Sequence, residues 1–180
     1  MRTTFIRDGS GQALVESAIS MTMLLILILG IVDFGRAIYD AEVIKNLAGE
    51  GSSMASRGTT ATITAGTITN FAGAPVKMGT NGCVIVTIVS NQSGTLTITD
   101  QAYQCGIGAT SKIGCLVGVN GCRSSNATLP SAAQHALSAE PSGSIMGVTE
   151  IYYKYSTITA VTALLGTNNL PSTFYTAAYY

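Results

Sequence analysis

The first part of the chain carries one long apolar run. Residues 17–32 contain no charged side chain, and residues 12–32 contain only Glu16. A helix of about 20 mostly apolar residues spans a bilayer, so this run predicts a membrane-spanning helix. Arg2 and Arg7 precede the run, and basic residues favour the cytoplasmic side. We therefore expect the N-terminus in the cytoplasm and the remainder of the chain outside.

The hydrophobic pattern changes after the run but keeps the spacing of a helix. Apolar residues recur at steps of three and four, which is typical of an amphipathic helix, and charged residues fall mostly on other faces. No proline precedes Pro75. One continuous helix from about Gln12 to about Arg57 is expected, and Gly58 provides a stop. The apolar face comprises Phe34, Ile38, Ala41, Ile44, Leu47 and Ala48, and the charged residues are Asp33, Arg36, Asp40 and Lys45.

Strand patterns dominate the rest of the chain. Residues 83–90 and 95–99 are β-branched or alternate at period two around the turn 91–94, which predicts a hairpin. Residues 147–159 and 174–180 predict two more strands. Thr59–Ala72 is ambiguous between helix and strand, and residues 104–145 are predicted to form a long loop region. The fold class expected is α+β, with a long N-terminal hydrophobic helix before a small antiparallel β-sheet domain and disulfide-pinned loops.

Composition narrows the function classes. The 180 residues are 10% charged with a formal net charge of +0, far below the roughly 25% of an average soluble domain. A neutral chain without a basic cluster is a poor partner for nucleic acid. Most charges lie within the first 58 residues, and the remainder is rich in Ser, Thr, Gly, Ala and Asn. This composition is often seen in secreted proteins and filament subunits.

Four cysteines follow the apolar run: Cys83, Cys105, Cys115 and Cys122. They form no C-x-x-C pair, so the spacing argues against zinc. Two disulfides in an oxidising compartment fit better. Three connectivities are possible, and we favour Cys83 with Cys105 and Cys115 with Cys122.

No catalytic constellation is visible, so we expect neither an enzyme nor a cofactor or metal. His135 is the only histidine, and it has no partner motif. Asn91-Gln-Ser and Asn126-Ala-Thr match the N-glycosylation pattern, but chance matches are expected in such a chain. A group of tyrosines suggests either an adhesive surface or sheet packing, and strand preferences favour packing. The group is Tyr152, Tyr153, Tyr155, Tyr175, Tyr179 and Tyr180.

Glu16 decides between readings of the N-terminus. A signal peptide or a plain single-pass anchor leaves this carboxylate unexplained, because a charge at membrane depth costs roughly 2.5–3.5 kcal/mol on insertion scales. Gly11-Gln-Ala-Leu-Val-Glu16 resembles the cleavage signature of type IV pilin-like proteins. The resemblance implies cleavage between Gly11 and Gln12 by a prepilin peptidase. It also implies that Glu16 pairs with the N-terminal amine of a neighbouring subunit.

The similarity extends to one family. The segments Gly11–Ala18, Leu29–Tyr39 and Ala48–Arg57 resemble TadE-like pseudopilins of the tight-adherence system, with looser similarity downstream. The sequence departs from the family at Ser17, where the family usually has an aromatic residue. It also lacks the proline that the family often carries in the apolar run. The resemblance implies a leader peptide at 1–11, an anchoring and assembly helix at 12–58, and an extracytoplasmic β-rich domain at 59–180.

The resemblance implies a structural function. It indicates a pseudopilin or minor pilin subunit of a type IV or tight-adherence pilus that assembles through its helix. The partners are copies of itself or other pilins, the prepilin peptidase and the pilus assembly machinery, with no nucleic acid. The protein would lie in the inner membrane and then in the extracellular pilus. The alternative is a membrane-anchored extracytoplasmic adhesion or binding protein that acts singly.

Overall fold

One helix, α1 (Ser10–Ser56), opens the computed structural model, which describes residues 10–73, 76–114, 122–124, 127–157 and 172–180. Two compact units divide the chain. Unit one contains Met1–Ala37 and Thr157–Asn169, and unit two contains Ile38–Ser156 and Leu170–Tyr180. α1 contributes to both units. The prediction of one continuous helix is confirmed, and the chain leaves it at Gly58, whose positive φ of 91° is the backbone conformation that glycine adopts most readily.

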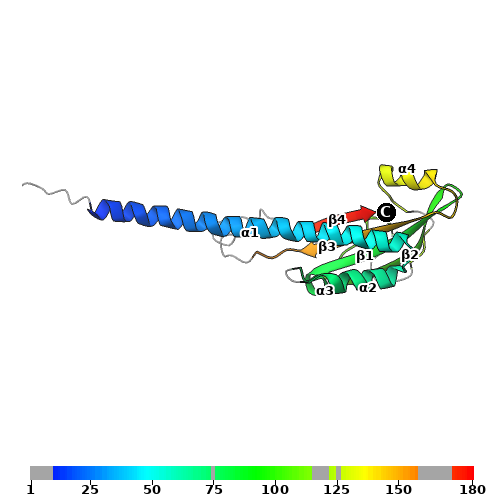
Figure 1. Ribbon diagram of the computed structural model, residues 1–180, viewed down its shortest axis with the longest axis horizontal. Coiled ribbons are helices and arrows are strands. Elements are labelled where there is room, and N and C mark those ends of the chain that lie inside the picture. The colour runs from blue at the N-terminus through cyan, green and yellow to red at the C-terminus, as the bar shows by residue number, and fades with distance from the viewer. Residues whose placement is uncertain (1–9, 74–75, 115–121, 125–126, 158–171) are drawn as a thin grey trace, which may run out of the picture. The chain divides into compact units, whose positions relative to one another are not determined.

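Unit two contains one antiparallel sheet of four strands in the order β2-β1-β3-β4 (Figure 1). β1 and β2 form the predicted hairpin. Its two central turn residues, Ser93 and Gly94, both have positive φ, as a type I′ turn requires. The strands are β1 (Gly82–Gln92), β2 (Thr95–Cys105), β3 (Ile145–Lys154) and β4 (Thr173–Tyr179). The α+β prediction is thereby confirmed.

The ambiguous segment after α1 is a helix, α2 (Ala61–Phe71), which contacts β1 and β2. Two polar contacts fix its start. The Thr60 hydroxyl accepts a hydrogen bond from the Ile63 N–H, and Asp100 Oδ2 accepts one from the Ala61 N–H at 3.1 Å. Such caps satisfy N–H groups that the first helical turn leaves open. A short helix, α3 (Met78–Asn81), precedes β1.

The second part of α1, residues 33–56, contacts β3 closely near its end. A Cβ added to Gly51 would lie 2.8 Å from Thr149 Oγ1, and one added to Gly147 would collide with the backbone of Ser52. Both glycines therefore allow a helix and a strand to approach more closely than side chains permit.

The other face of the sheet carries a separate apolar cluster. Side chains alternate between faces along a strand, so Val148 points away from α1 when Gly147 and Thr149 point toward it. The cluster contains Val89, Leu96, Ile98, Ile113, Leu129, Leu137 and Val148. Segments that follow β2 cover this face.

The prediction of one loop region over residues 104–145 is wrong in part. It contains α4 (Ser131–Ala139), whose Leu137 is buried in the apolar cluster. Its alanines, leucine and glutamine are good helix formers. The Gly- and Ser-rich flanks concealed this short helical pattern. β2 also extends to Cys105, beyond its predicted end at Thr99.

The predicted apolar face of the second part of α1 is also wrong in part. Ile44 and Ala48 are buried as expected, but Phe34 and Ile38 are 59% and 54% exposed. Asp33 and Asp40 are buried instead, and both interact within the chain. Periodicity shows which side chains share a face of a helix, but only the tertiary structure decides which face is covered.

Candidate assembly site

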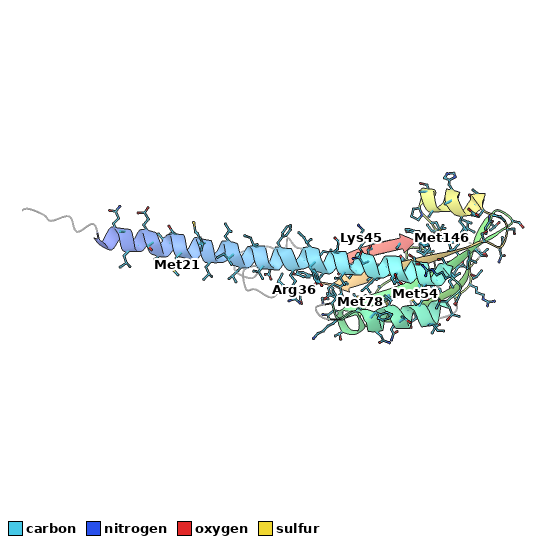
Figure 2. The ribbon with its side chains drawn as sticks, viewed as in Figure 1. Met21, Arg36, Lys45, Met54, Met78 and Met146 are labelled. Carbon is cyan, nitrogen blue, oxygen red and sulfur yellow. A yellow bond between two sulfur atoms is a disulfide. The ribbon has the colours of Figure 1, made fainter. Side chains whose placement is uncertain are left out.

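The first part of α1 offers an apolar surface on all sides. Residues 11–28 are exposed, including Leu14, Met21 and Leu25, and side chains project from both visible sides of the helix near Met21 (Figure 2). The Thr22 hydroxyl donates to the Ala18 carbonyl at 2.8 Å, so this polar group is satisfied within the helix. α1 is long and apolar enough to cross a membrane, and none of its most apolar window is buried within the chain. An exposed helix of this kind needs lipid or another protein around it.

The predicted processing and assembly residues lie at the start of this surface. Gly11, Gln12 and Glu16 are in the first turns of α1 and are exposed. Glu16 makes no hydrogen bond or ion pair with any described residue. The described part of the chain thus supplies no partner for this carboxylate. The leader itself, residues 1–9, lies outside the described residues.

Two of the four cysteines lie on neighbouring strands, Cys83 on β1 and Cys105 on β2. Cys83 and Cys105 are opposite each other in the β1–β2 ladder and form a disulfide, which is the pairing favoured from the sequence. Cys122 is also disulfide-bonded. Cys115 lies outside the described residues, so its pairing with Cys122 stays a prediction.

The structure also shows the surroundings of His135 and Asn91. His135 is exposed on α4, and no group of three or more His, Cys, Asp or Glu within the described residues is placed to hold a metal. Asn91 is 3% exposed, and its amide donates to the carbonyls of Leu137 and Glu140. Its nitrogen is therefore inaccessible for glycosylation in the folded chain. The second sequon begins at Asn126, outside the described residues.

A buried carboxylate on β3 was not recognised from the sequence. Glu150 is fully buried, and its two oxygens accept hydrogen bonds from the Ser111 hydroxyl, the Lys112 N–H and the Tyr175 hydroxyl. These donors come from the loop after β2 and from β4. Burying a charge costs free energy unless hydrogen bonds compensate it. Glu150 therefore ties the loop and β4 to the centre of the sheet, and its single position in the sequence carries no signal of this.

The tyrosines divide between packing and exposure. Tyr153 and Tyr155 are buried, whereas Tyr180 is 68% exposed. The rings of Tyr152 and Tyr175 lie 4.8 Å apart, and Lys112 Nζ lies 3.6 Å from the centre of the Tyr175 ring.

The ionisation of these tyrosines depends on the buried carboxylate. Burial, and secondly the charge of Glu150, raise the pKa of Tyr152 to about 12. The same causes and the hydrogen bond to Glu150 raise the pKa of Tyr175. Both hydroxyls stay protonated and can donate at neutral pH, which suits the packing interpretation of these two residues.

The exposed apolar helix and its carboxylate without a described partner both lie in the first part of the chain. The model of the TadE-like protein family matches residues 11–53. The TadE-like segment therefore starts at Gly11 and contains Glu16, the apolar run and most of the part of α1 that packs on the sheet. No match was found among curated proteins or among solved structures. The resemblance noted in the sequence is confirmed over this segment, and it supports a relation to the Tad pilus.

Proposed function

We propose that this protein is a pilin-like structural subunit of a type IV or tight-adherence pilus and assembles through α1. One observation carries the proposal: the TadE-like segment presents an apolar surface on all sides with one carboxylate, Glu16, that no described residue pairs. Lipid can cover this surface before assembly, and neighbouring helices can cover it afterwards. Moving between these surroundings keeps the apolar side chains out of water, so the transfer costs little free energy.

Glu16 then favours the assembled state. A carboxylate is poorly solvated in lipid, but in a helix bundle it can meet the ammonium group of a processed neighbour. Cleavage between Gly11 and Gln12 creates that ammonium on Gln12, four residues before Glu16. In this proposal the prepilin peptidase and the pilus assembly machinery are partners, and the helix crosses the inner membrane with its N-terminus in the cytoplasm. The subunit is structural and needs no cofactor.

The experiment compares Glu16→Gln with Glu42→Gln. Both replace an exposed carboxylate on α1 by an amide of similar shape, but only Glu16 lies within the apolar run. We expect both variants to insert into the membrane, while Glu16→Gln lowers the amount in sheared surface material by about tenfold or more. The physical reason is the free energy lost when one partner of a buried ion pair is removed.

Intact mass of the surface material tests the processing step. A mature chain that begins at Gln12 supports the proposal. If Glu16→Gln partitions like Glu42→Gln, and the surface protein retains Met1, the pilin-like role is rejected in favour of a membrane-anchored adhesion protein that acts singly.

A further inference from the structure

The two outer edges of the sheet differ. At β2, the Ile98 N–H donates to Ser124 O at 2.8 Å, Ser124 returns the bond, and the Ala127 N–H donates to Leu96 O. At β4, no described residue hydrogen-bonds to the backbone of the outer edge. The described residues thus cover part of one edge and leave the other edge open.

The ladder with β3 identifies the free groups on β4. Gly147 and Tyr180 exchange both backbone hydrogen bonds, and the Tyr155 N–H donates to Ser172 O. Bonded and non-bonded pairs alternate in an antiparallel ladder, so even-numbered residues of β4 bond to β3. The N–H and C=O groups of four odd-numbered residues therefore face outward. These residues are Thr173, Tyr175, Ala177 and Tyr179.

β4 lacks the features that keep such edges from pairing. Natural proteins protect exposed edges with charges, proline, bulges or very short strands. The seven residues of β4 include no charge and no proline, and their register with β3 runs without a shift. An unprotected strand of this length is a template for an added strand.

A groove beside β4 defines what fits there. It has a volume of about 600 Å³ and lies between the second part of α1 and β4. Its lining includes Gly49 and Ala178, together with one cation, Lys45, and one anion, Glu50. Lys45 is labelled beside β4 in Figure 2. A neutral strand with small side chains over the groove complements both the neutral edge and this electrically balanced lining.

The direction of α1 argues against antiparallel pairing between two copies of the same edge. Gly51 approaches Thr149, and the following turn approaches Gly147, so α1 runs opposite to β3. β4 is also antiparallel to β3, and α1 and β4 therefore run in the same direction (Figure 1). Antiparallel pairing of two β4 strands would point residues 38–56 of the two α1 helices in opposite directions, whereas the proposed function has the helices of all subunits running the same way.

We infer that the open edge of β4 is a docking site for an uncharged extended segment of a different pilus subunit, which joins the sheet as an added strand. The choice of a different subunit rests on the proposed function, because it requires α1 to lie in the membrane. Backbone hydrogen bonds supply the affinity, and the groove selects small side chains.

A labelled peptide tests the edge on the full-length chain in detergent micelles. The probe is the uncharged sequence of β4 (Thr173–Tyr179) with a solubilising tag and a fluorophore; free of a membrane anchor, it can pair in either direction. We expect saturable binding by fluorescence anisotropy. The same peptide N-methylated at two adjacent central residues, which blocks both of its edges, should not bind. Equal binding of the two peptides, or no binding of either, would overturn the docking site.

Variants on the protein sharpen this test. Ala177→Pro removes an outward N–H without removing a bond to β3 and should weaken peptide binding at least tenfold. The control, Ala177→Ser, keeps the N–H and should bind the peptide within about twofold of the parent chain. Proline is tolerated on edge strands when its missing N–H faces outward. Peptide binding in micelles does not depend on Glu16, so its failure is distinguishable from failure of the proposed function.

The identity of the docked subunit is tested with two differently tagged copies of the chain. We expect any copurification of the two copies to be unaffected by Ala177→Pro, because copies contact each other through α1. Copurification that Ala177→Pro abolishes would show that a second copy occupies the edge and would overturn the assignment to a different subunit.

Discussion

The two parts of α1 differ in what surrounds their side chains, although they form one continuous helix. From Leu14 to Val32 most side chains are large, apolar and exposed, whereas from Ile44 to Ala55 the buried side chains are mostly small and lie against the sheet. The first part has no packing partner in the described structure, and the second part is completed by its own domain. A helix can therefore be continuous in its backbone while only one part of it is stabilised by the chain itself.

Glu150 and Glu16 show the same difference between compensation inside the chain and none among the described residues. Glu150 is fully buried, and three donors of the same chain satisfy it. Glu16 is exposed on an apolar surface without a described partner. A charged residue whose compensation lies inside the chain stabilises the fold, whereas one without such compensation points to another molecule. This contrast is the physical basis for assigning assembly to the first part of α1.

The largest expected effect is on the free energy of unfolding, which should depend on the second part of α1 and not on the first. Ile44→Ala removes a side chain that is 2% exposed and should lower the free energy of unfolding by about 2–5 kcal/mol, as core truncations do. Leu25→Ala, at a position that is 54% exposed, should change it by less than about 0.5 kcal/mol. Urea unfolding in micelles, followed by the near-ultraviolet circular dichroism of the tyrosines, measures both. Equal losses would mean that the first part of α1 also packs within its own chain.

A smaller effect is expected at two neighbouring glycines of α1. A Cβ at Gly51 meets the stiff side chain of Thr149, whereas a Cβ at Gly49 meets nothing within 4 Å. Gly51→Ala should destabilise unit two by about 1–3 kcal/mol through overpacking. Gly49→Ala should stabilise the helix by up to about 1 kcal/mol. The same unfolding measurement decides, and a stabilising Gly51→Ala would disprove the close contact with β3.

The smallest effect concerns alkaline pH. The pKa of Tyr152 is raised to about 12 in the folded chain, first by burial and then by Glu150, whereas an unfolded tyrosine ionises near pH 10. Between these values the unfolded state binds fewer protons than the folded state, so stability falls as pH rises from about 10 to 12 and is unaffected below. Absorbance of tyrosinate at high pH should show late-titrating residues.

Glu150→Gln provides the control for the alkaline titration. It removes the charge that opposes ionisation of Tyr152 and Tyr175, so both should titrate earlier than in the parent chain. Unchanged titration would mean that burial alone sets the shift and that Glu150 has no electrostatic role on this face.

Most of the elements followed from local patterns. The apolar run, the absence of proline before Pro75 and the glycine at 58 determine α1. Alternation around residues 91–94 determines the hairpin, and the spacing of Gly11 and Glu16 within an apolar context identifies the segment that the TadE-like family model matches. These features depend on residues close in sequence, so the sequence by itself determined them.

The remaining features depend on residues far apart in the chain. Only the tertiary structure buries Asp33 and Asp40 in place of Phe34 and Ile38. It also brings Ser111 and Tyr175 to Glu150, and it places β4 at an edge of the sheet that no other described strand pairs. The physical reason is that periodicity groups side chains on one element, whereas burial, charge compensation and edge pairing depend on what another element places opposite them.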